Sequence, residues 1–133
     1  MSLQLLLNAP LAVQLHLWTA VAAFVIGCAN LFRAKGTASH KFLGRIWIAL
    51  IAIVALSSFW IHDINVWYGF SPIHLISIYV LIMAPLGVWH VRQGNIKGHR
   101  NAMIGTFVGG LVIAGLLTLA PGRLIARALF GWE

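Results

Sequence analysis

The side chains of this 133-residue chain that are best suited to chemistry are six histidines. Neutral imidazole is the commonest protein ligand for metals, and its charge changes near physiological pH. The surrounding sequence is strongly apolar, and ionisable residues in apolar spans usually face a bundle interior or a cavity and mark function. The histidines to be placed are therefore His16, His40, His62, His74, His90 and His99.

Four of these histidines recur in an internal repeat. His16 begins the run His-Leu-Trp-Thr, and His74 begins the similar run His-Leu-Ile-Ser. Further along each copy, Gly36 aligns with Gly94, and the pair His-Lys at position 40 aligns with His-Arg at position 99. Such a repeat predicts two helical hairpins related by an axis along the membrane normal. It places His16 and His74 towards one membrane face, and the other two histidines at the opposite face.

Each histidine pair could hold a haem. Haem iron accepts axial histidine ligands, and facing helices are where bundle cofactor sites are built. We expect His16 with His74, and His40 with His99, to hold two b-type haems that carry electrons across the membrane, with quinone as a possible redox partner. The single Cys, Cys28, excludes the motif for covalent haem attachment. Cations expected to neutralise haem propionates are Lys41, Arg45 and Arg100 at one face and Arg123 at the other.

Two other interpretations remain open. A bare Zn or Cu ion needs three or more protein ligands, which predicts that His40, His90 and His99 converge. Alternatively, the chain is a non-catalytic membrane subunit or assembly factor whose histidines lie at the membrane interface. Interfacial hydrogen bonding is also the interpretation for His62 and His90, because neither has a counterpart in the repeat.

The elements that must position these residues are membrane spans. Hydrophobic residues make up 61% of the chain and charged residues only 8%, and a span needs about 20 predominantly apolar residues. Four stretches qualify, at residues 10–32, 42–61, 72–90 and 101–120. The sequence therefore predicts an all-α integral membrane four-helix bundle, built from two hairpins, with residues 1–133 as a single transmembrane domain.

Basic residues indicate the orientation of these spans. The link between the first two spans and the link between the last two are rich in Lys and Arg, whereas the middle link holds Asp63 and no basic residue. By the positive-inside rule, the basic links face the cytoplasm and both termini lie outside. The net charge of +7 then reflects topology, and no nucleic-acid partner is expected because the chain lacks contiguous polar surface.

Other motifs limit the alternatives. The only acidic residues are Asp63 and Glu133, so the sequence favours redox chemistry or binding over hydrolysis by paired carboxylates. Gly105 and Gly109 form a Gly-x-x-x-Gly face for close helix contact. We expect this face to pack the helices of the bundle together or, alternatively, to form a homodimer in the lipid bilayer.

Several segments resemble a known family. The run His-Lys-Phe-Leu-Gly-Arg at residues 40–45 and the run His-Arg-Asn-Ala-Met at residues 99–103 are similar to the H-R-x-L-G and H-R-x-x-M motifs of small predicted bacterial membrane proteins of unknown function. Lys41 departs from the usual Arg but keeps the charge. In architecture alone, the chain resembles transmembrane dihaem b-type cytochromes such as ascorbate-dependent ferric reductases and haem A synthase. That similarity implies the same two histidine pairs.

Overall fold

A computed structural model describes residues 2–61 and 72–132 and contains four long apolar helical segments. Three are continuous helices: α2 (Leu11–Leu31), α3 (Ala38–Ser58) and α4 (Pro72–Arg92). The fourth joins α5 (Ile96–Phe107), the π-helix η1 (Val108–Ile113) and α6 (Ala114–Leu117). Each segment is long and apolar enough to cross a membrane, with a mean hydropathy of 1.5 to 1.8, which confirms the prediction of four long apolar helices. His62, Asp63 and Glu133 lie outside the described residues.

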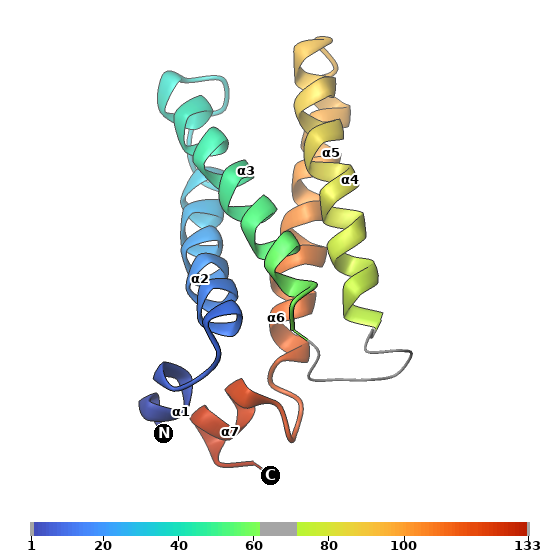
Figure 1. The fold of residues 1–133 in the computed structure, drawn as a ribbon. Helices are drawn as coiled ribbons and strands as arrows, with labels where there is room; N and C mark the ends of the chain where they lie inside the picture. The colour runs from blue at the N-terminus through green and yellow to red at the C-terminus, as the bar shows by residue number, and fades with distance from the viewer. Residues whose placement is uncertain (1, 62–71, 133) are drawn as a thin grey trace.

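The helices form two hairpins, as predicted. α2 packs against α3, and α4 packs against α5. Both hairpin turns lie at one end of the bundle, which we call the loop end, and both chain termini lie at the opposite, terminal end (Figure 1). Gly36 and Gly94 adopt φ angles of 77° and 76° in the two turns. This left-handed conformation suits glycine and commonly follows the end of a helix.

Two helices begin about one turn before the predicted positions. The Thr37 hydroxyl accepts a hydrogen bond from the His40 backbone N–H at 3.2 Å and caps α3. The Asn95 side chain accepts a bond from the Gly98 N–H at 2.9 Å and caps α5. These caps satisfy backbone donors that a helix start otherwise leaves unpaired. His40 and His99 consequently lie inside the first turns of their helices.

The two hairpins meet in a buried core near the middle of the bundle. Trp47 donates its indole N–H to the Ala23 carbonyl at 3.0 Å. A Cβ atom at Gly27 would lie 2.7 Å from the Phe107 ring and 2.8 Å from the Trp47 indole nitrogen, so this close approach requires glycine. All four spans contribute to the core, which comprises Ala23, Trp47, Ile51, Ala55, Val80, Ala84, Phe107 and Leu111.

The Gly105 and Gly109 face packs α5 and η1 against α4. A Cβ atom at Gly109 would lie 3.4 Å from the Tyr79 ring, and one at Gly105 would meet the Tyr79 hydroxyl. The glycines therefore serve helix packing inside the chain, which is one of the two predicted uses. Because Tyr79 occupies this face, a homodimer through Gly105 and Gly109 has no support in the structure.

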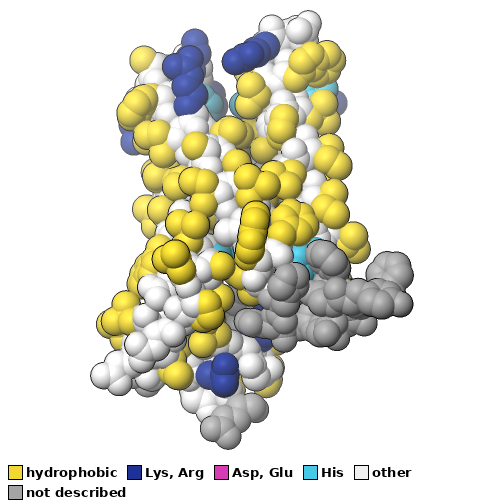
Figure 2. Space-filling view, viewed as in Figure 1, with side chains coloured by type: hydrophobic (Ala, Val, Ile, Leu, Met, Phe, Trp, Pro, Cys, Tyr) yellow, Lys and Arg dark blue, Asp and Glu magenta, His cyan; other side chains and the backbone are white. Residues whose placement is uncertain are grey.

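Two short helices that were not predicted cover the terminal end. α1 (Leu3–Leu7) packs against α7 (Leu124–Phe130), and the Ser2 N–H donates to the Ala128 carbonyl at 2.7 Å. Elsewhere the outer surface of the long helices is largely apolar, whereas basic side chains cluster at the loop end (Figure 2). An apolar exterior of this kind is suited to a lipid bilayer as solvent.

Candidate functional site

The candidate site at the loop end begins with two anchored imidazoles. His40 Nδ1 lies 3.1 Å from the Asn30 side-chain oxygen, and the Asn30 amide nitrogen donates to the His40 carbonyl at 3.3 Å. His99 Nδ1 donates to the Gly87 carbonyl at 2.9 Å. In both neutral rings these acceptors place the proton on Nδ1 and leave a lone pair on Nε2. Within the described residues, neither Nε2 atom makes a hydrogen bond.

This arrangement of the ring is the one that metal-ligating histidines usually have, with one nitrogen held by an oxygen acceptor and the other presented to the metal. His40 belongs to the first hairpin and His99 to the second. The two rings lie within electrostatic range of one another. Figure 2 shows histidine beside a hollow between the hairpin tips. The structure thus brings the predicted loop-end pair towards one space from two hairpins.

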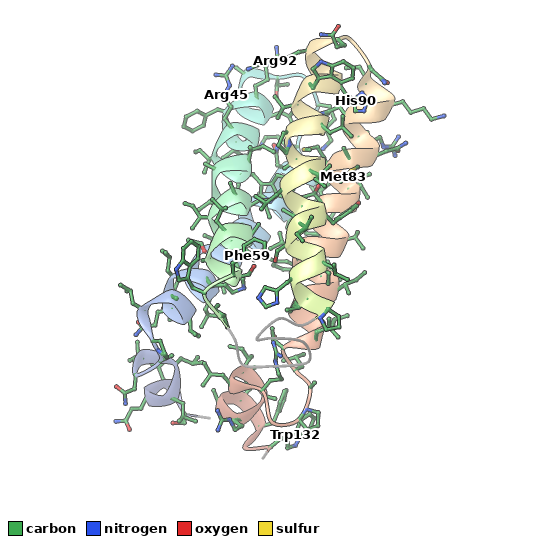
Figure 3. The ribbon with its side chains drawn as sticks, turned by 45° about the vertical axis from the view of Figure 1, so that its right-hand side comes forward. Arg45, Phe59, Met83, His90, Arg92 and Trp132 are labelled. Carbon is green, nitrogen blue, oxygen red and sulfur yellow. The ribbon has the colours of Figure 1, made fainter. Side chains whose placement is uncertain are left out.

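Basic side chains gather at the loop end of the bundle (Figure 2). Arg45 of α3 and Arg92 of α4 lie at the same end of the bundle although they belong to different hairpins (Figure 3). Guanidinium groups bind carboxylates with strong, directional hydrogen bonds. The described residues include no Asp or Glu to compete for these cations. Seven Lys and Arg residues lie in or near the two hairpin turns: Arg33, Lys35, Lys41, Arg45, Arg92, Lys97 and Arg100.

Not every cation at the loop end is available for a ligand. The Lys35 ammonium donates to the carbonyls of Asn30, Leu31 and Arg33 at 2.6 to 2.9 Å, and so satisfies the end of α2. Lys41, Arg45 and Arg100, the three predicted site cations, are exposed and make no side-chain hydrogen bond within the described residues. They remain candidates for holding an anionic group.

The predicted pair at the terminal end has different surroundings. His16 Nδ1 donates to the Val54 carbonyl at 2.9 Å and lies 3.1 Å from the Ser57 hydroxyl, all within its own hairpin. His74 is buried, and its Nε2 donates to the Ser58 carbonyl at 3.1 Å across the two hairpins. The two rings therefore bond these carbonyls through different nitrogens. His16 lines a cavity whose α4 wall does not include His74, so this pair offers less support for a shared haem.

The convergence required by a bare metal ion is not found. His90 Nδ1 lies 3.2 Å from the Asn95 amide nitrogen, and its ring packs beside Trp89. Figure 3 shows His90 near the turn of the second hairpin. In residues 2–61 and 72–132, no three His, Cys, Asp or Glu side chains are grouped as metal ligands. His40, His90 and His99 therefore do not form the three-ligand site.

A cavity of about 520 Å³ lies between the hairpins in the terminal half of the bundle. Its walls come from all four spans and are mostly apolar. Its polar lining includes His16, Arg123 and a pair of serines, Ser58 and Ser77, whose hydroxyl oxygens lie 2.6 Å apart. This volume falls within the range of sites for small molecules. Arg123, the predicted cation at this end, thus lines this cavity and not a space between His16 and His74.

Sequence reasoning missed the residues that hold the loop-end histidines. Asn30 is a polar side chain at the end of an otherwise apolar run, and that contrast is a signal for a buried hydrogen-bonding role. The Gly87 carbonyl left no such signal, because every residue has a backbone oxygen. Its use depends on the close contact of α4 with α5, where a Cβ at Gly87 would lie 3.1 Å from Ala102 Cβ.

No curated protein and no solved structure matches this chain. A family model described as a predicted membrane protein, DUF2306, matches residues 13–128. This range includes both loop-end histidines and all four spans apart from the first two residues of α2. The chain therefore belongs to the DUF2306 family of predicted membrane proteins.

Proposed function

We propose that this DUF2306 protein binds one b-type haem at its loop end and transfers single electrons in the bacterial inner membrane. His40 and His99 would hold its iron. One observation carries the proposal: the two rings come from different hairpins, and an oxygen acceptor holds each Nδ1 while Nε2 makes no hydrogen bond within the described residues. This is the tautomer that a metal ligand bonded through Nε2 requires.

The donor set and its charges fit this group. Two neutral imidazoles are suitable axial ligands for a b-type haem. Lys41, Arg45 and Arg100, together with Arg92, supply cations for two propionates at a place where the described chain offers no acidic competitor. Binding would be non-covalent, because the one cysteine of the chain, Cys28, lies within α2.

The chain's own residues would hold and tune the site. The Asn30 side chain and the Gly87 carbonyl fix the orientation of the rings and increase the basicity of the ligating nitrogens. The core that includes Trp47 and Phe107 would limit access from the terminal half. A bound haem supplies a one-electron carrier whose potential depends on its axial ligands, hydrogen bonding and burial.

Orientation and partners complete the proposal. The positive-inside rule places the loop end in the cytoplasm and both termini outside. A quinone or another small redox molecule would be the electron partner, because a single haem near one membrane face needs a mobile partner. His16 and His74 bond carbonyls through different nitrogens and do not line the same cavity, which gives no comparable support for a second haem.

Absorption spectroscopy tests the proposal. Protein expressed with a haem supply should show a Soret band, and the pyridine haemochrome should give one haem b per chain. His40→Ala and His99→Ala should each abolish or severely reduce the band, and added imidazole should partly restore it. His90→Ala is the matched control, because His90 lies at the same end but bonds Asn95, and it should keep the full band. A folded wild-type protein without a Soret band would reject haem binding and favour the non-catalytic subunit.

A further inference from the structure

We propose that the cavity in the terminal half binds an amphiphile with an anionic headgroup, the hydrocarbon chain lying between the hairpins and the headgroup at Arg123. The shared chemistry is a single carboxylate or phosphate joined to a long apolar chain. This inference does not depend on haem binding, because its residues lie in the opposite half of the bundle from His40 and His99.

The walls of the cavity favour a hydrocarbon chain. Most of the lining is aliphatic, and it includes Ile51, Val80 and Leu111 of the core. The wall hydroxyls are already paired: Ser58 with Ser77 and with the Ala55 carbonyl, and Thr118 with the Gly115 carbonyl. Ordered water needs two to four polar partners. An apolar chain suits these walls better than a file of water molecules does.

The charge at the cavity favours an anionic headgroup. Arg123 lies between α6 and α7, at the terminal end, and lines the cavity. Within residues 2–61 and 72–132, its guanidinium makes no hydrogen bond and has no acidic partner. Arginine binds carboxylates and phosphates through two parallel hydrogen bonds. A headgroup with either anion would satisfy Arg123 while its chain remains in the apolar cavity.

An irregular helix forms one wall of the same cavity. η1 contributes Gly110, Leu111 and Val112 to the lining. π-helical segments are rare and occur frequently at functional sites. Gly115, just after η1, also lines the cavity, and a Cβ atom there would meet nothing within 4 Å. The wall therefore combines an unusual backbone with open space, in keeping with a ligand site.

Native mass spectrometry can measure the ligand. Purified protein in phosphatidylcholine nanodiscs would be loaded with equal amounts of oleate, lysophosphatidate or uncharged monoolein. We expect one retained oleate or lysophosphatidate per chain, and the preferred anion identifies the source as a fatty acid or a phospholipid. Equal retention of monoolein would overturn the assignment of an anionic headgroup, and retention of none of the three would overturn the site.

Paired variants locate the ligand. Arg123→Gln should weaken binding about tenfold, which corresponds to about 1.4 kcal/mol, whereas Arg127→Gln should not, because Arg127 is exposed and does not line the cavity. Gly115→Leu should block the cavity, and Gly115→Ala should bind as the wild type does. Unchanged binding in Arg123→Gln and Gly115→Leu would overturn the proposal. The haem content of these variants should stay the same, so a failure here is distinct from a failure of haem binding.

Discussion

The loop end and the terminal end use the same residue type in different ways. At the loop end, each histidine is held by an oxygen from its own hairpin and presents its other nitrogen. At the terminal end, His74 uses Nε2 to reach across to Ser58 of the other hairpin. The hairpins diverge towards the loop end and approach each other in the lower half of the bundle (Figure 1). Histidine is therefore available as a ligand at the loop end and helps to join the hairpins at the terminal end.

The largest expected effect concerns the side of the membrane on which each end lies. In a Cys28→Ala background, Ala34→Cys in the first turn should resist an impermeant maleimide in intact cells, whereas Asn8→Cys at the terminal end should react. Both positions are exposed in the structure, and the positive-inside rule places them on opposite sides. Broken cells should label both variants. Labelling of Ala34→Cys in intact cells would reverse the proposed orientation.

The buried core between the two hairpins should be destabilised by one added carbon atom. Gly27→Ala places a Cβ against Phe107 and Trp47, and overpacking of this kind costs about 1–3 kcal/mol. Gly44→Ala is the control, because a Cβ atom at Gly44 would have the Asn30 amide nitrogen as its nearest neighbour, at 3.7 Å. The free energy of unfolding can be measured by denaturation in mixed detergent micelles. Equal stability of the two variants would show that the hairpins are not held together by this core.

The terminal-end histidine should contribute to stability without affecting haem content. His16→Ala removes the hydrogen bond to the Val54 carbonyl and the contact with Ser57. A typical hydrogen bond contributes about 1 kcal/mol, and a partly buried site such as this one should lose about that amount. The melting temperature should fall while the Soret band stays. Loss of the Soret band in His16→Ala would show that haem binding also depends on the terminal end, contrary to our proposal.

The smallest expected effect is the link between hairpins at the terminal end. The Ser58 and Ser77 hydroxyl oxygens are 2.6 Å apart. A double-mutant cycle with Ser58→Ala and Ser77→Ala should give a coupling energy of about 0.6 kcal/mol, the average for hydrogen bonds between membrane helices. The same cycle on Ser39 and Ser77, which belong to opposite ends, should give none. A coupling of zero for the first pair would remove this bond from the contacts that join the hairpins.

Much of the architecture was predictable from local properties of the chain. Run lengths of about 20 apolar residues led to four spans, and the repeated glycines at positions 36 and 94 marked the two turns. The starts of α3 and α5 were misplaced by about a turn, because Thr37 and Asn95 extend each helix into polar sequence. α1 and α7 were missed, since helices of 5 and 7 residues depend on mutual packing rather than on a strong local pattern.

The site was only partly predictable. The sequence by itself determined that the chain is apolar, that its basic residues flank the spans and that four histidines recur in a repeat, because composition and spacing are local properties. Only the tertiary structure decided which ring nitrogen bonds a backbone oxygen, since that depends on acceptors such as the Gly87 and Ser58 carbonyls on neighbouring helices. The same is true of the cavity at Arg123, whose walls come from all four spans and exist only when the hairpins are packed together.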